Sequence, residues 1–135
     1  MSLEIPSNLV CAEEIAVGPE HSAKHVGSGD VEVLSTPSMI AFMEMVALNC
    51  VQRYLPDNMT TVGIRVDVKH LNPAPVGSKI VVEAKLVKIE GKKLVFEVRA
   101  KLGDTVIGEG VHERYIVDRQ RFLDKVRRIL SQLKT

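Results

Sequence analysis

Glu44 is the residue whose surroundings first suggest chemistry. It is the one charged group in an apolar segment, "MIAFMEMVALNCVQ", that covers residues 39–52. An ionised carboxylate buried without partners costs so much free energy that the group shifts its pKa instead. Glu44 therefore lies at the surface, is paired with another group, or is retained because a reaction requires it.

Thr36 and His70 are candidates for the same chemistry. Apolar residues alternate with other residues along 61–71, which predicts a strand whose core-facing side includes His70. The apolar members of that side are Val62, Ile64, Val66 and Val68. Thr36 precedes Pro37 at a predicted N-cap, where free N–H groups and the helix dipole favour negative charge. We therefore expect a hydroxyl, a carboxylate and an imidazole to converge on one pocket beside an oxyanion site.

Each of these three residues also has a purely structural interpretation. Thr36 would only cap its helix, as a threonine before a proline commonly does. His70 would end its strand and bind a carbonyl of the following loop. Glu44 would face solvent from a helix with one open side. The residues alone leave these alternatives open.

The composition is that of one ordinary globular domain, which we assign to residues 1–135. Hydrophobic residues make up 45% of the chain and charged residues 26%, unlike a disordered segment. The net charge of +1 provides no strong attraction to nucleic acid or anionic lipid. Aromatic residues are only 4% and tryptophan is absent, which disfavours base stacking with single-stranded nucleic acid. We therefore expect neither nucleic acid nor membrane as a partner.

The N-terminal residues and the two cysteines indicate the cellular compartment of the protein. Acidic residues stand where a signal peptide needs basic and then apolar residues, and the 39–51 segment is too short to cross a bilayer. Cys11 and Cys50 form no CxxC motif and have no metal-ligand spacing with the histidines. These observations predict a cytoplasmic protein without a disulfide framework and without a metal site.

The order of predicted elements defines the fold class. A glycine-containing segment over residues 21–30 predicts a mobile loop, and a buried helix follows from Pro37 to about Tyr54. Strands are predicted at 61–71, 78–89, 93–102 and 105–117, with turns at Gly91 and at 103–104. Asp118 then caps an amphipathic helix. This is an α+β domain in which an antiparallel sheet wraps around a central helix, and its long edge strand predicts a homodimer.

Three segments carry a resemblance to a known family. They are "STPSMIAFMEMVALNCV", "TVGIRVDVKHLNPAPVG" and "GEGVHERYIVDRQRFLDKV". Together with the order of elements, they resemble the hot-dog fold and, within it, the fluoroacetyl-CoA thioesterase branch. The resemblance extends from about His21 to the last helix. Its core is a threonine, a glutamate eight residues later, and a histidine before a proline-rich turn.

The resemblance implies hydrolysis of acyl-CoA thioesters to a free acid and CoA. It assigns catalysis to Thr36, Glu44 and His70, with Thr36, Glu44 or water as the attacking group. It also implies that the backbone of Gly63 lies near the thioester. No cofactor is implied, because CoA enters as part of the substrate.

The resemblance further matches the "HER" of the last strand, which is His112, Glu113 and Arg114, to a position near the path of the acyl-CoA, and assigns substrate binding to His112 and Arg114. From the residues alone, His112 is better interpreted as a structural histidine whose partner is Glu113 or Arg114.

One departure from the family pattern concerns the acyl group. The member specialised for fluoroacetyl groups has a longer, phenylalanine-rich lid, whereas this chain has "HVGSGDVEVL", with no aromatic residue. The resemblance therefore supports thioester hydrolysis and not selectivity for fluorine. Two alternatives are a hot-dog hydratase or dehydratase and a non-catalytic acyl-CoA-binding module.

Overall fold

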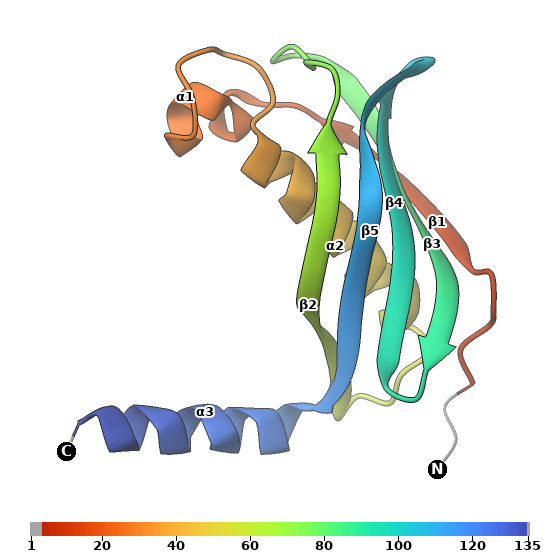
Figure 1. Ribbon diagram of the computed structural model, residues 1–135, viewed down its shortest axis with the longest axis vertical. Helices are drawn as coiled ribbons and strands as arrows, with labels where there is room; N and C mark the ends of the chain where they lie inside the picture. The colour runs from red at the N-terminus through yellow and green to blue at the C-terminus, as the bar shows by residue number, and fades with distance from the viewer. Residues whose placement is uncertain (1–3, 135) are drawn as a thin grey trace.

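The computed structural model describes residues 4–134 and consists of one antiparallel sheet with three α-helices and one 3-10 helix, Pro19–His21 (Figure 1). The strands are β1 (Val10–Ala16), β2 (Met59–His70), β3 (Lys79–Glu90), β4 (Lys93–Leu102) and β5 (Thr105–Asp118), and the helices are α1 (Ala23–Val26), α2 (Thr36–Gln52) and α3 (Arg119–Leu133). The strand order is β1-β3-β4-β5-β2, so β1 and β2 form the two edges. The predicted α+β fold, with a sheet around a central helix, is confirmed.

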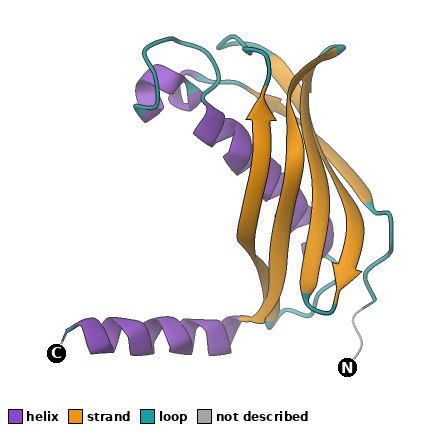
Figure 2. Cartoon of the chain, viewed as in Figure 1, coloured by secondary structure: helices purple, strands orange, loops and turns teal. Residues whose placement is uncertain are grey.

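Helix α2 crosses one face of the sheet and forms the centre of the core (Figure 2). Its buried residues are Met39, Phe42, Met43, Val46, Ala47, Cys50 and Val51. They pack against alternate residues of β3 and β4, such as Val82 and Phe96, because those side chains point to the same face of the sheet. The helix begins one residue earlier than predicted: Ser35 is the N-cap and accepts a hydrogen bond from the Ser38 N–H at 3.0 Å. The prediction that Thr36 is the N-cap was wrong.

Strand β2 contains a bulge that reverses its inward face. Its register against β5 shifts between Gly63 and Arg65. Before the bulge, Thr61 is buried opposite Ile116, and after it Val66 pairs with the buried His112. A bulge adds one residue to one strand, so every side chain beyond it changes face.

The predicted inward face of this strand was therefore right only beyond the bulge, and even there Val66 is 40% exposed. Val68 and His70 lie on the core side, as expected. Ile64, which was predicted to face the core, is 50% exposed. Before the bulge, Thr61 and Gly63 take the inward positions that had been assigned to Val62 and Ile64.

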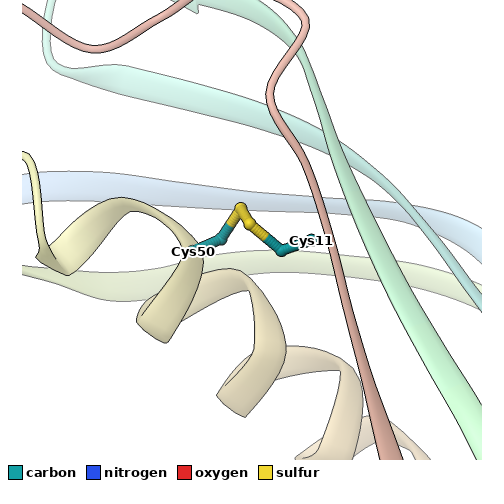
Figure 3. The surroundings of a disulfide bond; sticks show 2 residues. All are labelled: Cys11 and Cys50. Atoms are coloured by element: carbon teal, nitrogen blue, oxygen red, sulfur yellow. A yellow bond between two sulfur atoms is a disulfide. The ribbon is translucent and has the colours of Figure 1, made fainter.

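The N-terminal strand β1 and a disulfide were not predicted from the sequence. Strand β1 pairs antiparallel with β3, and Cys11 on β1 forms a disulfide with Cys50 near the end of α2 (Figure 3). The expectation of no disulfide was wrong because the fold brings the two Cα atoms to 5.7 Å, within the range that a disulfide spans. The bond fastens an edge strand to the central helix.

The turns and the second cap follow the sequence closely. Gly91 and Gly103 close the β3–β4 and β4–β5 hairpins with φ of 63° and 59°, values that favour glycine. Asp118 accepts a hydrogen bond from the Arg121 N–H at 3.1 Å and caps α3, as predicted. The predicted loop over residues 21–30 contains the short helix α1, which Ser22 caps.

Helix α3 leaves the sheet at the end of β5 and runs outward past the edge strand β2 (Figure 1). One side of this helix is apolar, yet its apolar residues are exposed in the single chain: Phe122, Leu123, Val126, Ile129, Leu130 and Leu133. Within residues 4–134, no helix is both long enough and apolar enough to cross a bilayer.

The disulfide should contribute measurably to stability. Cys11 and Cys50 are 39 residues apart, and closing a loop of that length stabilises a protein by about 4 kcal/mol through the entropy of the unfolded chain. We expect Cys11→Ser to lower the free energy of unfolding by that order in urea titrations. Adding reductant should destabilise the wild-type protein and leave the variant unchanged. Equal stability of the reduced and oxidised proteins would contradict this expectation.

Candidate active site

A hydroxyl–imidazole pair lies at the N-terminus of α2. The Thr36 Oγ1 and His70 Nδ1 atoms are 2.7 Å apart, so the first residue of the helix is joined to the last residue of β2. Burial lowers the pKa of His70 below its ordinary value of 6.5, and the backbone of Asn72 opposes this effect. The His70 Nε2 atom is buried and has no hydrogen-bond partner among the described residues. An unpaired buried nitrogen is costly and is therefore a candidate contact for a ligand.

The same helix terminus retains a backbone donor. The Ser35 side chain accepts from the Ser38 N–H, and Pro37 has no N–H to donate. The Thr36 N–H has no hydrogen-bond acceptor within residues 4–134. An open pocket lies beside this turn and is lined by both Thr36 and His70, together with neighbours such as Asn72. Free N–H groups at a helix N-terminus favour a developing negative charge.

Glu44 lies in a second cluster, further along α2. Its Oε2 atom is 3.7 Å from Nη1 of Arg114 on β5, and its side chain is 41% exposed. A Cβ atom added at Gly63 would lie 2.8 Å from the same carboxylate oxygen, so the missing side chain of Gly63 leaves room for Glu44. The carboxylate in the apolar helix is therefore both paired and partly open to solvent.

The partner of Glu44 is a firmly held guanidinium. Arg114 is 6% exposed and donates through Nε to Thr61 Oγ1 at 2.7 Å and through Nη2 to the Thr61 carbonyl at 3.0 Å. Burial lowers the pKa of Arg114, and the Glu44 carboxylate raises it. Thr61 was not predicted as part of the site. The signal that points to it is Gly63, because a glycine inside a strand often marks a bulge.

His112 completes this cluster beneath Arg114. It is 1% exposed, its Nε2 atom lies 3.1 Å from Arg114 Nη1, and its Nδ1 atom lies 2.8 Å from the Arg65 carbonyl oxygen. Its ring also stacks on Phe96, with the ring centroids 6.4 Å apart. The sequence left Glu113 and Arg114 as possible partners of His112. In the structure, the His112 side chain contacts Arg114.

The structure therefore separates the predicted residues into two half-sites. We call Thr36 with His70 the hydroxyl half-site, and Glu44 with Gly63, His112 and Arg114 the carboxylate half-site. Thr36 and Glu44 are eight residues apart on one helix, or about 12 Å along its axis. The expected convergence of hydroxyl, imidazole and carboxylate on one pocket does not occur within a single chain, because Thr36 bonds to His70 and Glu44 faces Arg114.

A five-stranded antiparallel sheet wrapped around one helix, with polar groups gathered on that helix, is the hot-dog architecture. Comparison with known proteins narrows this class. The family model for the fluoroacetyl-CoA-specific thioesterase matches residues 17–120, and the chain belongs to this family.

Individual relatives agree with that assignment. The fluoroacetyl-CoA thioesterase of Streptantibioticus cattleyicolor is 33% identical over 96 residues, which is 71% of this chain and 69% of the relative. Acyl-coenzyme A thioesterase 13 of Mus musculus is 26% identical over 114 residues, 82% of this chain and 74% of the relative.

A solved structure agrees as well. A fluoroacetyl-CoA thioesterase with a substituted threonine, in complex with acetyl-CoA, superposes with a TM-score of 0.86 at 26% identity, covering 92% of this chain and 98% of that one. The predicted family and the predicted class of enzyme, an acyl-CoA thioesterase, are confirmed.

The buried His112 and the partly buried His70 make stability depend on pH. Burial lowers the pKa of both His70 and His112 below 6.5, so the unfolded chain binds protons more readily than the folded chain. Stability should be constant above about pH 7 and should fall as the pH decreases through 6.5 toward the folded-state pKa values. Urea titrations between pH 8 and 5 measure this change. His112→Gln should show a shallower decline, and a free energy of unfolding that rises on acidification would contradict the expectation.

Proposed function

We propose that this enzyme hydrolyses acyl-CoA thioesters at a site formed by Thr36, Glu44 and His70. The observation that carries the proposal is the half-exposed Glu44 carboxylate, because it is the one acidic group on an otherwise apolar central helix and faces a buried guanidinium. A carboxylate fixed in this way can serve as a general base or as a nucleophile. Arg114 positions the carboxylate in either role.

In the proposed reaction, the N-terminal turn of α2 polarises the thioester carbonyl, and the Thr36 N–H, which has no acceptor among the described residues, supports this role. An oxygen of Glu44, of Thr36 or of a water molecule activated by Glu44 attacks the carbonyl carbon. The carbon–sulfur bond then breaks, and the CoA thiolate takes a proton that His70 helps to deliver through Nε2, which has no hydrogen-bond partner within residues 4–134. Where Glu44 or Thr36 has attacked, a water molecule then hydrolyses the acyl-enzyme, which releases the free acid and restores the side chain. Mass spectrometry of peptides from protein quenched during turnover distinguishes the three attacking groups, because attack by a side chain acylates Thr36 or Glu44 and attack by water acylates neither.

We further propose that one active site is assembled from two copies of the chain. If two α2 helices pair antiparallel about a twofold axis near Ile40, Thr36 of each copy lies opposite Glu44 of the other, since both are four residues from the axis. Exposed residues along α2 support such a pairing: Ala41 is small and exposed, and Met45 is 39% exposed. A small residue at the crossing point allows close approach of the two helices.

The surfaces beside α2 also support a homodimer. Strand β2 is an unpaired edge with two exposed apolar residues, Ile64 and Val66. Helix α3 runs outward past the same edge (Figure 1), and its apolar residues are exposed in the single chain. Unpaired edges and contiguous exposed apolar surface are typical of interfaces.

Removing the charge of Glu44 tests the catalytic role. Glu44→Gln preserves the shape of the side chain, so we expect a folded protein with thioesterase turnover lowered by at least about a hundredfold, the scale of a lost general base. Release of free thiol, followed with a colour reagent, measures the rate and separates hydrolysis from hydration or simple binding. Near-normal turnover in a folded variant would make Glu44 structural.

The proposed dimer should be visible in solution. We expect the wild-type protein to sediment as a dimer at micromolar concentration, and Ala41→Glu to weaken the dimer and reduce turnover together, because it places a charge at the helix crossing. Lys79→Glu, an exposed substitution at the start of β3, is the control and should change neither property. A fully active monomer would refute the shared site.

The enzyme should discriminate only weakly between acyl groups of its substrates. Residues 25–34, which lead from α1 to α2, contain no phenylalanine, tyrosine or tryptophan that could gate the site. Without a dedicated polar or closely shaped contact, we expect acetyl-CoA and fluoroacetyl-CoA to be hydrolysed with kcat/KM values within about a hundredfold of each other. A preference of several orders of magnitude for the fluorinated substrate would show that another part of the site selects the acyl group.

A further inference from the structure

The hydrogen bonds of His112 determine its protonation state. Its Nδ1 atom lies 2.8 Å from the Arg65 carbonyl oxygen, which can only accept, so Nδ1 carries the proton. Its Nε2 atom lies 3.1 Å from Arg114 Nη1, which can only donate, so Nε2 carries a lone pair. These two contacts require a neutral ring in one specific tautomer.

The surroundings of His112 oppose its protonation. The ring is 1% exposed and lies between the backbone of β2 and Phe96 on β4. The charged groups around it are Arg114 and Glu113 on its own strand and Glu44 on α2. Burial and then Arg114 lower its pKa, while the Arg65 carbonyl and the two carboxylates raise it, and the pKa ends below 6.5.

Four contacts fix the orientation of the Arg114 guanidinium. Thr61 accepts from its Nε and Nη2 atoms, His112 accepts from Nη1, and the same Nη1 faces Glu44 at 3.7 Å. If His112 bound a second proton, an N–H group would point at the guanidinium, and two cations would adjoin in a buried site. The guanidinium would then have to turn away from one of its partners.

We propose that His112 is a positioning residue: as a neutral hydrogen-bond acceptor, it directs Arg114 toward Glu44 and so sets the geometry of the catalytic carboxylate. This role differs from the contact with acyl-CoA that the family resemblance implies for His112, and it rests on the proposed function of Glu44. The proposal predicts that kcat falls at low pH as His112 becomes protonated. This fall is separate from the one caused by titration of the groups that touch the substrate.

Two variants separate the two hydrogen bonds of the ring. In His112→Asn the amide replaces Nδ1 and keeps the donor to Arg65, but Arg114 loses its acceptor. In His112→Gln the amide oxygen reaches the position of Nε2 and keeps that acceptor, without a titratable group.

The two variants should differ in rate and in pH dependence. We expect kcat to fall by about tenfold or more in His112→Asn, the scale of a hydrogen bond lost from a charged group, with KM little changed. His112→Gln should stay within about threefold of the wild type and lose part of the acidic decline in kcat. Both variants should be checked for folding by circular dichroism. Equal losses in the two variants, or an acidic decline in His112→Gln identical to that of the wild type, would overturn the proposal.

A measurement on the wild-type protein tests the proposal without relying on activity or on the folding of a variant. Nitrogen NMR of protein labelled with ¹⁵N-histidine distinguishes the protonated from the unprotonated ring nitrogen, and the His112→Gln spectrum assigns the His112 signals. We expect a neutral ring at pH 7.5 with the proton on Nδ1. A ring protonated on Nε2, alone or together with Nδ1, would overturn the proposal. Failure to hydrolyse any acyl-CoA, with the expected tautomer observed, would instead refute the proposed function.

Discussion

The spacing of Thr36 and Glu44 on a rigid helix is the constraint on which the proposed mechanism depends. Helix α2 is clamped along its length by the sheet and tied by a disulfide near its end, so its residues cannot shift relative to one another. Eight residues correspond to about 12 Å of helix, more than two short side chains can span. A single chain therefore presents two half-sites, and a twofold partner is the simplest way to join a hydroxyl to a carboxylate.

The carboxylate half-site shows how the sheet supports a carboxylate on the helix. A buried guanidinium costs several kcal/mol unless its donors are satisfied. Here the bulge in β2 turns Thr61 inward, where it accepts two hydrogen bonds from Arg114, and His112 accepts a third. The remaining direction of the guanidinium faces Glu44. The bulge in the edge strand β2 thus fixes Arg114, and through Arg114 it fixes the orientation of Glu44 on α2.

Much of the fold could be predicted because local signals agree with the final structure. The apolar segment that forms α2, the glycine turns of both hairpins and the Asp118 cap depend on residues close in sequence. Strand β1 was missed because its alternation is interrupted by the pair Glu13 and Glu14. The disulfide was missed because it joins residues that are far apart in the chain. The residues next to each cysteine carry no sign of this contact.

The contacts among the candidate residues could be predicted only in part. Thr36 and His70 do meet, because the start of α2 and the end of β2 lie beside each other. The separation of Glu44 from them follows from helix geometry, which the expectation of a single pocket neglected. The inward turn of Thr61 could not be foreseen from alternation, since one added residue at a bulge reverses the pattern. Only the glycine at position 63 hinted at that irregularity.

Subunit complementation tests the shared active site most directly. Thr36→Ala and Glu44→Gln chains, each nearly inactive alone, are unfolded together and refolded as a mixture, and thioester hydrolysis is measured against wild-type protein treated in the same way. If each site combines Thr36 of one copy with Glu44 of the other, half of the dimers are mixed and each has one intact site, so the mixture should recover about a quarter of the wild-type activity. A mixture no more active than its components, despite proven subunit exchange, would contradict the account and return the whole reaction to a single chain.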